Sequence, residues 1–445
     1  MTTIFLLASL LFAVPPTGPA SSPTTSTTPA AMKLTLLDQS APPPPATPLP
    51  DEAAPAPVET TGGETTVPWI LRYRDWLTAP AAMRGSAVGL QIPIPSRRDL
   101  ASRGITLNVG QVTDVSRIGV ASESSGHSTR GYAEVSATLD FGRVTHRDGD
   151  QVFVQFYGKH GMAASALAGD IQGTSNIDAE DFARLGEFWY ETWVVPDRLR
   201  LKIGRVDAAT EFAHSEHGSV FLAAPMGASP TIVGFPTYPA PTLSANMFWQ
   251  PNAIVYASAG VYDGRAATPD DLGLPLFMVG EGGLRWGGRP GRVAVGVWHH
   301  TSRTLQLDPA GDHASTGPYL VIDQSLWRAR PDDEESPGIC VFLQSSTANA
   351  DVSLVTRHLG AGVVWTGPFA SRASDAVGFG LTRATLSEHA PDGAVGRETS
   401  VGPFYRLQIT DAIGLQPNLQ YVRNPGGTRP GQGAIVWTLR VESRF

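Results

Sequence analysis

The sequence predicts an all-β protein whose antiparallel strands close into a transmembrane β-barrel. From about residue 105 to residue 445, runs of about ten residues alternate between apolar and polar side chains, and clusters of Gly, Asp, Pro and Asn separate the runs. The chain opens on an apolar run that is too short to cross a bilayer as a helix. It ends on Phe445, and the alternation continues almost to that residue. Together these observations indicate an exported protein that crosses a membrane with strands.

The first twenty residues have the pattern of a secretory signal peptide. The apolar run IFLLASLLFAV covers residues 4–14 and the small residues TGPA follow at 17–20, although no Lys or Arg precedes the run. A short buried helix of the mature fold is the alternative. No later stretch reaches the roughly 18 consecutive apolar residues that a membrane helix needs. We therefore expect cleavage near Ala20 and a mature protein without a helical membrane span.

Two segments separate this signal from the expected barrel. Residues 21–68 are rich in Pro, Thr and Ala and cannot bury a core, so a disordered linker is predicted. Residues 69–104 have a mixed composition that fits either a short helix or a plug-like periplasmic segment. The barrel is expected to occupy residues 105–445.

The alternating runs separate into an apolar and a polar face. In the run 129–142, Val135 and Leu139 lie on the apolar side, and Tyr132 and Glu134 lie on the other. A soluble sandwich or propeller would also accept such runs. A membrane barrel fits better, because aromatic residues stand near strand boundaries and closure removes the exposed sheet edges.

The length of the alternating region fits a barrel of sixteen strands. About 340 residues divided among 16 strands leave about 21 for each strand and its connection, and 14 or 18 strands would also fit. Pro417 interrupts one of the runs and removes a backbone donor, which suggests a bulge or a position at the rim.

The composition excludes several functions. The formal net charge of −8 gives no reason to expect nucleic-acid binding. Only three of the 33 cationic residues are lysines, so nearly all the positive charge is arginine. Cys340 is the only cysteine, so no intramolecular disulfide can form. Its simplest interpretation is a small apolar residue in a strand.

Several stretches of the chain resemble the carbohydrate-selective porin (OprB) family. They are GDIQGTSNIDA (169–179), RLGEFWYETWV (184–194), RLRLKIGRVDAATEF (198–212), AVGFGLTRA (376–384) and LQPNLQYVRNPGG (415–427). Phe445 matches the terminal aromatic residue that outer-membrane barrels present to their assembly machinery. The resemblance implies a 16-stranded outer-membrane barrel that lets sugars such as glucose diffuse through a narrow, charged eyelet. The oligomeric state, monomer or trimer, stays open.

One hairpin carries the residues that we expect to line this eyelet. A turn at Pro196 and Asp197 would pair two strands and point their charged sides the same way. The residues on these sides are Glu187, Trp189, Glu191 and Trp193 on the first strand and Arg198, Arg200 and Lys202 on the second. Glu191 is expected opposite Arg200 or Lys202. Charged groups accept and donate hydrogen bonds to sugar hydroxyls, and indole rings stack on pyranose C–H faces. An ion-paired barrel wall without ligand preference is the alternative.

The following segment, GRVDAATEFAHSEHG (204–218), holds weaker eyelet candidates. They are Arg205, Asp207 and Glu211, which the resemblance places in a loop within or beside the lumen. The HSEH motif lacks the spacing of a zinc site, so no metal and no cofactor is predicted.

Catalysis and a purely structural role are the other function classes. No G-x-S-x-G elbow is present, and nothing in the pattern brings a Ser or Asp together with a His, so no enzyme activity is predicted. A general or structural barrel, tethered to the cell envelope through the Pro-rich segment, is the alternative to a sugar pore. The expected partners are permeating sugars, outer-membrane lipid and the barrel-assembly machinery of a Gram-negative-type cell, and no nucleic acid.

Overall fold

The described residues form a closed β-barrel. The computed structural model describes residues 97–120, 125–145, 149–266, 274–287, 289–302, 307, 315–330, 336–390, 394, 396–428 and 432–445. The predicted signal peptide, the Pro-rich linker and most of the segment 69–104 lie outside these ranges. At the end of that segment the short helix α3 (Arg97–Ser102) leads into the barrel.

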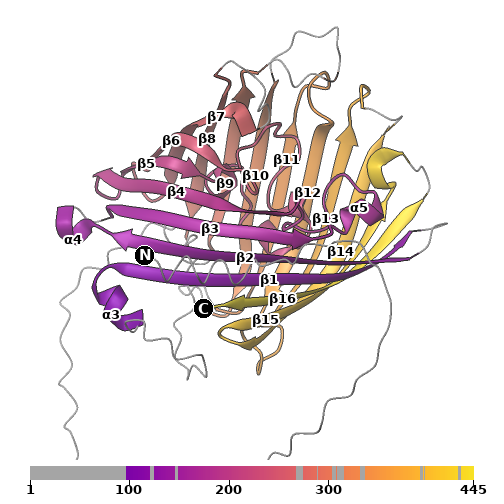
Figure 1. The fold of residues 1–445 in the computed structure, drawn as a ribbon, viewed down its shortest axis with the longest axis horizontal. Coiled ribbons are helices and arrows are strands. Elements are labelled where there is room, and N and C mark those ends of the chain that lie inside the picture. The colour runs from indigo at the N-terminus through magenta and orange to yellow at the C-terminus, as the bar shows by residue number, and fades with distance from the viewer. Residues whose placement is uncertain are drawn as a thin grey trace, which may run out of the picture. The chain divides into compact units, whose positions relative to one another are not determined.

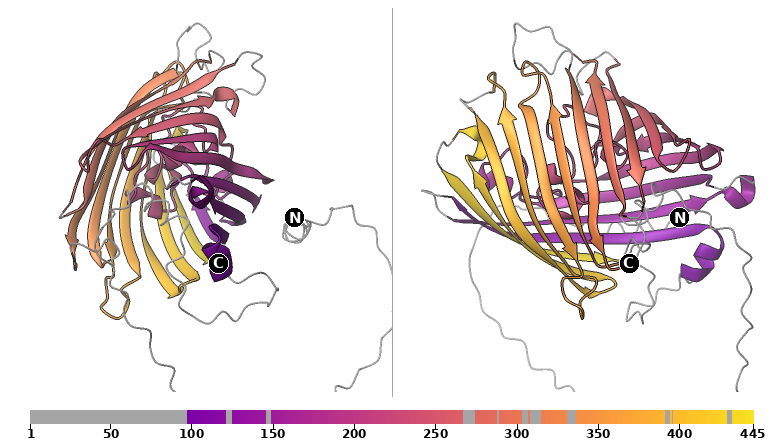
Figure 2. Two further views of the ribbon diagram at one scale, coloured as in Figure 1. Left: turned by 90° about the vertical axis from the view of Figure 1, so that its left-hand side faces the viewer. Right: turned by 180° about the vertical axis from the view of Figure 1, so that it is seen from behind.

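Sixteen antiparallel strands make up the barrel, which confirms the predicted fold class and strand number. Each strand pairs with its neighbours in sequence, and β1 and β16 complete the ring (Figure 1; Figure 2). The strands are β1 (Ile105–Val120), β2 (Gly126–Asp140), β3 (Gln151–Gly161), β4 (Phe182–Val195), β5 (Leu199–Val206), β6 (Thr242–Trp249), β7 (Val255–Asp263), β8 (Leu276–Trp286), β9 (Gly291–His300), β10 (Ser315–Arg328), β11 (Gly338–Thr347), β12 (Val355–Thr366), β13 (Ala376–Leu386), β14 (Arg397–Thr410), β15 (Ile413–Arg423) and β16 (Gly433–Arg444).

Helices in the described part of the chain are short. Besides α3, they are α4 (Gly142–Thr145), α5 (Ser165–Ala168) and the 3-10 helices η1 (Ala208–Thr210), η2 (Gly218–Val220), η3 (Ala224–Met226), η4 (Gly264–Ala266) and η6 (Pro425–Gly427). None of the helices described here is long and apolar enough to cross a membrane.

The last strand closes the barrel. β16 pairs with β1 along residues 434–444, and Phe445 extends the ladder through two backbone hydrogen bonds with Val109, of 2.8 and 2.9 Å. Inside the barrel, the hydroxyl groups of Ser116 and Thr438 lie 2.8 Å apart across this seam. The alternation at the end of the sequence is therefore the pattern of the closing strand.

The barrel wall is polar inside and apolar outside. On β16 the outward side chains of Trp437 and Leu439 are 56% and 44% exposed, whereas Arg440, the next residue, points inward and is 5% exposed. Pro417 lies opposite Leu439 in regular register within β15, so the suggestion of a bulge or rim position is wrong. A proline removes only its own backbone N–H donor from the β-ladder, so the strand can continue past it. Exposed apolar side chains around buried charged ones are typical of a barrel that faces lipid.

The connections distinguish the two ends of the barrel. At one end they are short turns such as 196–198 and 411–412, and at the other they include the loops 162–181 and 207–241. Membrane barrels have short periplasmic turns and longer extracellular loops, so we assign the short-turn end to the periplasm. Exposed tryptophans on the outer surface stand near that end, as an interfacial girdle does: Trp249, Trp286, Trp327 and Trp365.

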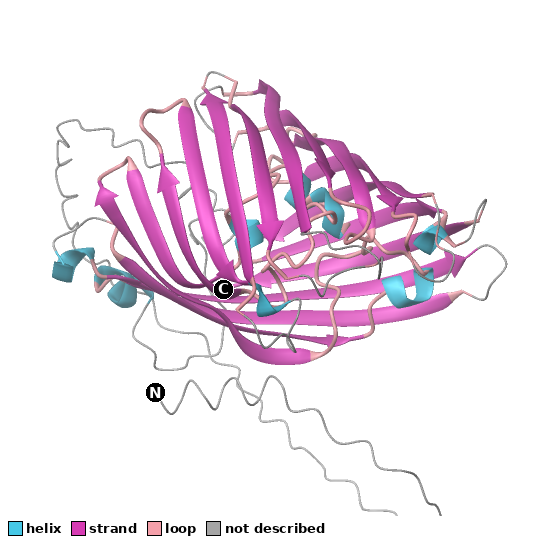
Figure 3. Cartoon of the chain, turned by 90° about the horizontal axis from the view of Figure 1, so that it is seen from above, coloured by secondary structure: helices cyan, strands magenta, loops and turns pink. Residues whose placement is uncertain are grey.

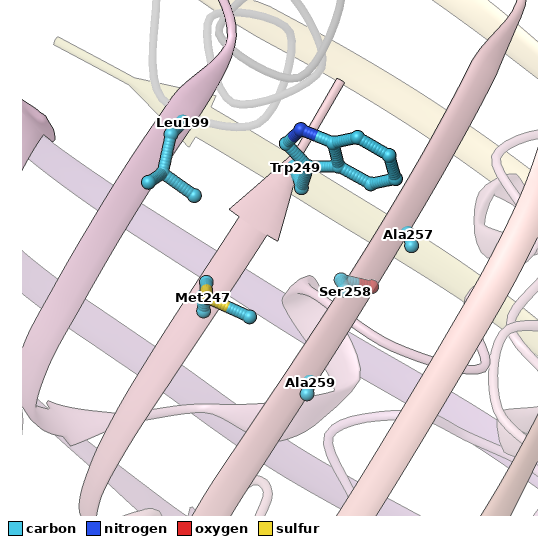
Figure 4. A pocket seen from close by; sticks show the side chains of 6 residues that line it. All are labelled: Leu199, Met247, Trp249, Ala257, Ser258 and Ala259. Atoms are coloured by element: carbon cyan, nitrogen blue, oxygen red, sulfur yellow. The ribbon is translucent and has the colours of Figure 1, made fainter. Parts of the chain in front are cut away.

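A shallow pocket on the outer surface crosses β5, β6 and β7 (Figure 4). The small side chains of Ala257 and Ala259 leave a hollow beside Leu199, Met247 and Trp249. Met247 and Trp249 are exposed on the outside of the barrel. The pocket therefore faces lipid and does not belong to the lumen.

Candidate lumen constriction

Two loops from the long-loop end fold into the barrel. Loop 162–181 joins β3 to β4, and loop 207–241 joins β5 to β6; short helices and loop segments are visible within the ring of strands in Figure 3. The loops meet at two hydrogen bonds: Ala224 donates its amide to the Gly173 carbonyl (3.2 Å), and Tyr238 donates its hydroxyl to the Ile177 carbonyl (3.0 Å). Because both loops occupy the interior, they narrow the lumen.

Four charged side chains connect the wall to the start of loop 207–241. The β4–β5 register places Glu191 opposite Lys202, one of the two cations predicted. The Glu191 carboxylate lies 2.5 Å from the Arg200 guanidinium and 3.0 Å from Lys202 Nζ. Glu211 reaches from the loop to the same cations, with Arg200 at 3.1 Å. All four side chains are almost fully buried, so two cations and two carboxylates neutralise each other away from water.

Aromatic rings cover this charged group. The Arg200 guanidinium carbon lies 3.7 Å from the centre of the Phe248 ring, and Lys202 Nζ lies 4.4 Å from the centre of the Trp189 ring. Trp189 stacks on Phe153 with ring centres 5.0 Å apart and is only 1% exposed. A desolvated cation gains more from an aromatic face than an exposed one does. The rings therefore help to hold the two cations in place.

Glu187 and Asp207 fix the two ends of loop 207–241. The Asp207 amide donates to Glu187 at 3.1 Å, where the chain leaves β5. The Asp207 carboxylate accepts from the amides of Ala209 and Tyr238, both at 2.9 Å. One carboxylate thus caps the 3-10 helix η1 and ties the start of the loop to its return segment.

Three other predicted eyelet residues lie outside this arrangement. Trp193 is partly exposed and lies opposite Arg200 in the ladder. Arg205 pairs in register with Phe188 and Leu243, whose side chains are 52% and 64% exposed on the outside. The register therefore does not bring Arg205 to the buried cluster. Arg198 is exposed in the turn before β5.

The remainder of loop 207–241 is held by acidic side chains of distant strands. Glu281 on β8 accepts from the Ala213 amide at 3.0 Å. Asp323 on β10 accepts from the Ser215 hydroxyl (2.9 Å) and from the amides of Glu216 and His217 (3.3 and 3.2 Å). Two glutamines on β11 and β15 donate to carbonyls further along the loop. The loop is therefore attached at many points around the wall.

Loop 162–181 is held by side chains of one continuous sector of the wall, which include Thr382 on β13, Gln420 on β15 and Arg440 on β16. Glu398 on β14 accepts from the amides of Ile171 (3.0 Å) and Gln172 (3.2 Å) and is fully buried. Asp178 forms an ion pair with Arg130 on β2 at 2.6 Å. On the other side of the loop, Asp114 accepts from the Ser175 hydroxyl (2.7 Å) and pairs with Arg440 (2.8 Å) across the β1–β16 seam.

An aromatic group on the inner wall was not predicted. The rings of Tyr132, Tyr157, Phe182 and Tyr238 lie with their centres 5.4 to 6.0 Å from one another in five contacts. All except Tyr157 are partly exposed. The alternation assigns Tyr132 and Tyr157 to polar, inward faces, but no pattern links them to the loop residue Tyr238.

A polar edge borders these rings. Glu134 accepts from the Tyr132 hydroxyl and from the Gln155 amide group, both at 2.7 Å, and Glu134 and Gln155 are partly exposed. Ring faces beside acceptors and donors are the combination that a sugar can use. Among the described residues there is no group of three or more His, Cys, Asp or Glu side chains that could hold a metal ion.

The family is identified by comparison with known proteins. Residues 125–445 match the carbohydrate-selective porin, OprB family. The chain belongs to this family. OprB-family membership and the closed barrel together point to a channel protein of the outer membrane and not to an enzyme.

Individual relatives are similar at low identity. Porin B of Pseudomonas aeruginosa is 24% identical over 210 residues, 39% of this chain, and the match spans only 45% of Porin B. The putative porin QuiX of Acinetobacter baylyi is 20% identical over 360 residues, 71% of this chain and 79% of QuiX. The high-pH structure of Pseudomonas putida OprB has a TM-score of 0.69 at 17% identity, covering 78% of this chain and 96% of that one. These likenesses support the fold.

Proposed function

We propose that this OprB-family barrel lets small sugars, such as glucose, diffuse across the outer membrane through the constriction made by loops 162–181 and 207–241. The observation that carries this proposal is that both loops lie inside the barrel and are attached to its inner wall by buried charged side chains. A passage narrowed by fixed loops selects solutes by size and by the groups at its border. A neutral sugar gains nothing from net charge, so paired charges of both signs suit it.

The predicted eyelet residues enter this proposal in two roles. Glu191, Arg200, Lys202 and Glu211 are positioning residues, because their burial leaves them little contact with a passing solute. Glu187 and Asp207 hold the ends of the same loop, while Trp189 packs behind the cations. Trp193 and Arg205 stay as eyelet candidates on the basis of the sequence.

Direct contact with sugar is assigned to the aromatic group and its polar edge. Partly exposed faces of Tyr132, Phe182 and Tyr238 would stack on pyranose C–H groups, and Glu134 and Gln155 would exchange hydrogen bonds with hydroxyls. We expect Tyr238→Ala to weaken sugar block of ion current more than Tyr421→Ala, which removes an exposed ring from the outer surface.

Liposome swelling and planar-bilayer recordings test the proposed function. Monosaccharides should enter faster than disaccharides of the same charge, and sugar should reduce ion current in a concentration-dependent way. A barrel that conducts ions but neither admits sugars preferentially nor shows sugar block would favour a general pore. A barrel without conductance would favour the structural alternative, an anchor of the cell envelope.

Phe445 is proposed to carry an assembly signal in addition to closing the barrel. Deleting it removes two backbone hydrogen bonds at the seam and an exposed ring, both of which are minor losses near an interface. We therefore expect folding of purified protein in detergent to be nearly unchanged, while the amount of assembled barrel in cells falls strongly. Heat-modifiable gel mobility of outer-membrane fractions measures this, and normal assembly of the deletion variant would refute the signal.

A further inference from the structure

Four arginines form a row on the outer surface at the long-loop end. They are Arg357 on β12, Arg383 on β13, Arg397 on β14 and Arg423 on β15, called here the arginine row, and all four are exposed. An adjoining residue in each strand is buried inside the barrel: His358, Thr382, Glu398 and Val422. The alternation of each strand therefore directs the arginines outward.

The strand register makes these arginines neighbours. Arg357 and Arg397 both lie opposite Thr385, and Arg383 and Arg423 both lie opposite Thr399. Each arginine is thus the diagonal neighbour of the next one, on adjoining strands. Diagonal positions are within reach of long side chains. The register therefore places the four arginines as successive diagonal neighbours along one edge of the outer surface.

The charges of the arginine row are not matched by ion pairs among the described residues. Within the described part of the chain, none of the four arginines forms an ion pair. By contrast, the exposed Arg265, at the same end of the barrel, pairs with Asp263 at 2.5 Å. The chain has a net charge of −8, so carboxylates are plentiful elsewhere. Adjacent like charges repel each other unless an anion lies between them.

The depth of the row fits a lipid headgroup. The next outward residues toward the middle of the barrel include Leu359 (39% exposed) and Tyr421 (45% exposed), which belong to the lipid-facing apolar surface. The row therefore stands where hydrocarbon gives way to headgroups. A guanidinium group binds phosphate through two parallel hydrogen bonds, which a row of arginines can repeat.

We propose that the arginine row binds the phosphate groups of lipid headgroups in the outer leaflet of the membrane. Charge complementarity and depth carry this proposal, and it does not depend on what passes through the lumen. The bound lipid would neutralise the row and fix the β12–β15 wall against that leaflet.

Lipid retention by the full-length barrel tests the proposal. The protein is incorporated into phosphatidylcholine vesicles that contain diphosphorylated lipid A, extracted with neutral detergent, and examined by native mass spectrometry for retained lipid A. A second set of vesicles contains the monophosphorylated form. The test variant is R383Q/R397Q/R423Q. The matched control is R103Q/R198Q/R289Q, which removes three exposed arginines from separate segments at the opposite end.

The wild type and the control should retain the diphosphorylated lipid in preference to the monophosphorylated one. The test variant should bind diphosphorylated lipid A at least about tenfold more weakly than the wild type, because charge-assisted hydrogen bonds to its phosphates are lost. Liposome swelling with sugars should be the same in all three proteins. Equal lipid retention by test variant and wild type, or equal loss in the control, would overturn the proposal.

A lysine variant controls for the possibility that the glutamine substitutions impair folding. R383K/R397K/R423K keeps the positive charges but loses the planar guanidinium groups that bind phosphate through two hydrogen bonds. Its affinity for diphosphorylated lipid A should therefore lie between those of the wild type and the glutamine variant. Heat-modifiable mobility shows whether each variant is folded. Folded lysine and glutamine variants with the same affinity as wild type would exclude phosphate recognition by these side chains.

Discussion

The two inward loops are held in different ways. Loop 207–241 is attached to the wall by Glu211, by Glu281 and Asp323 on β8 and β10, and by glutamines on β11 and β15. Loop 162–181 is attached by the Glu398 carboxylate, by Thr382 and Gln420 on the strands beside it, and by an ionic group of Asp114, Arg130 and Arg440. The supports of the first loop are spread around the barrel, whereas those of the second are concentrated on one continuous sector of neighbouring strands, β13 to β16 and β1 to β3.

This difference predicts how each loop responds to damage. Where many contacts hold a loop, the loss of one leaves the others to restrain it. Where the supports lie on one sector and a single carboxylate such as Glu398 accepts several amide hydrogens, the loss of that carboxylate loosens the adjoining part of the loop. Each buried amide left without a partner costs about 1–3 kcal/mol. We therefore expect the longer loop to be the more robust of the two.

Glu398→Ala should have the largest effect. It removes the acceptor of the Ile171 and Gln172 amides and of the Gly426 amide on the neighbouring loop (2.7 Å). Loop 162–181 should become sensitive to protease, and disaccharide swelling rates should rise severalfold. Glu388→Ala, which removes an exposed glutamate at the same end, is the control. An unchanged swelling rate in Glu398→Ala would remove the argument for concentrated support.

Asp323→Ala should have a smaller effect on loop 207–241. It frees the Ser215 hydroxyl and the amides of Glu216 and His217, but the Glu211 and Glu281 contacts persist. Proteolysis of this loop should increase less than that of loop 162–181 in Glu398→Ala, and single-channel conductance should stay within the range of the wild type. A larger change than in Glu398→Ala would reverse the comparison.

Substitutions in the buried charged cluster should change ion selectivity, and they should also destabilise the barrel because the remaining partners are left with an uncompensated buried charge. Glu191→Gln removes a negative charge and Arg200→Ala a positive one, so they should shift ion selectivity in opposite directions. Both should weaken sugar block by about tenfold or less, as expected for roughly 1 kcal/mol. Trp189→Ala should weaken block without a shift in selectivity. Unchanged sugar block in all three variants would show that this cluster does not position the constriction.

The smallest expected effect is a pH dependence confined to loop 162–181. Burial, together with the nearby Glu398 charge, raises the pKa of Asp170 in this loop to about 7. A raised carboxyl pKa means that the charged form is disfavoured in the folded loop. The loop should therefore be most firmly held in acid and less so as pH rises through 7.

Current noise in planar bilayers measures this dependence. Current noise should be greater at pH 8 than at pH 5 in the wild type, and Asp170→Asn should reduce the difference. Asp181→Asn changes an exposed carboxylate of the same loop and should leave the difference intact. Noise that grows toward acid pH would contradict the sign of this argument.

Features that depend on local alternation were predictable from the sequence. The inward and outward faces of the strands and the opposition of Glu191 to a cation follow from period-two patterning and a short turn. These predictions need no knowledge of distant contacts, because each strand pairs with its neighbours in the chain.

The supports of the loops were not predictable in the same way. Asp323 and Glu398 lie more than a hundred residues from the loop amides that they accept from, and on the sequence they are ordinary inward-facing polar residues. The burial of Glu191 and Arg200 also depends on where Glu211 returns to the wall. Alternation specifies which way a side chain points but not what will cover it.

The β1–β16 seam has a consequence for the order in which the barrel folds. Its paired residues, such as Ser116 and Thr438, are separated by almost the whole length of the barrel sequence. Contacts between such distant positions cost the most chain entropy and form slowly. The ring therefore cannot close until the final strand has been delivered, and an incomplete chain leaves two unpaired edges. A closed channel therefore forms only after the last dozen residues have paired with the first strand.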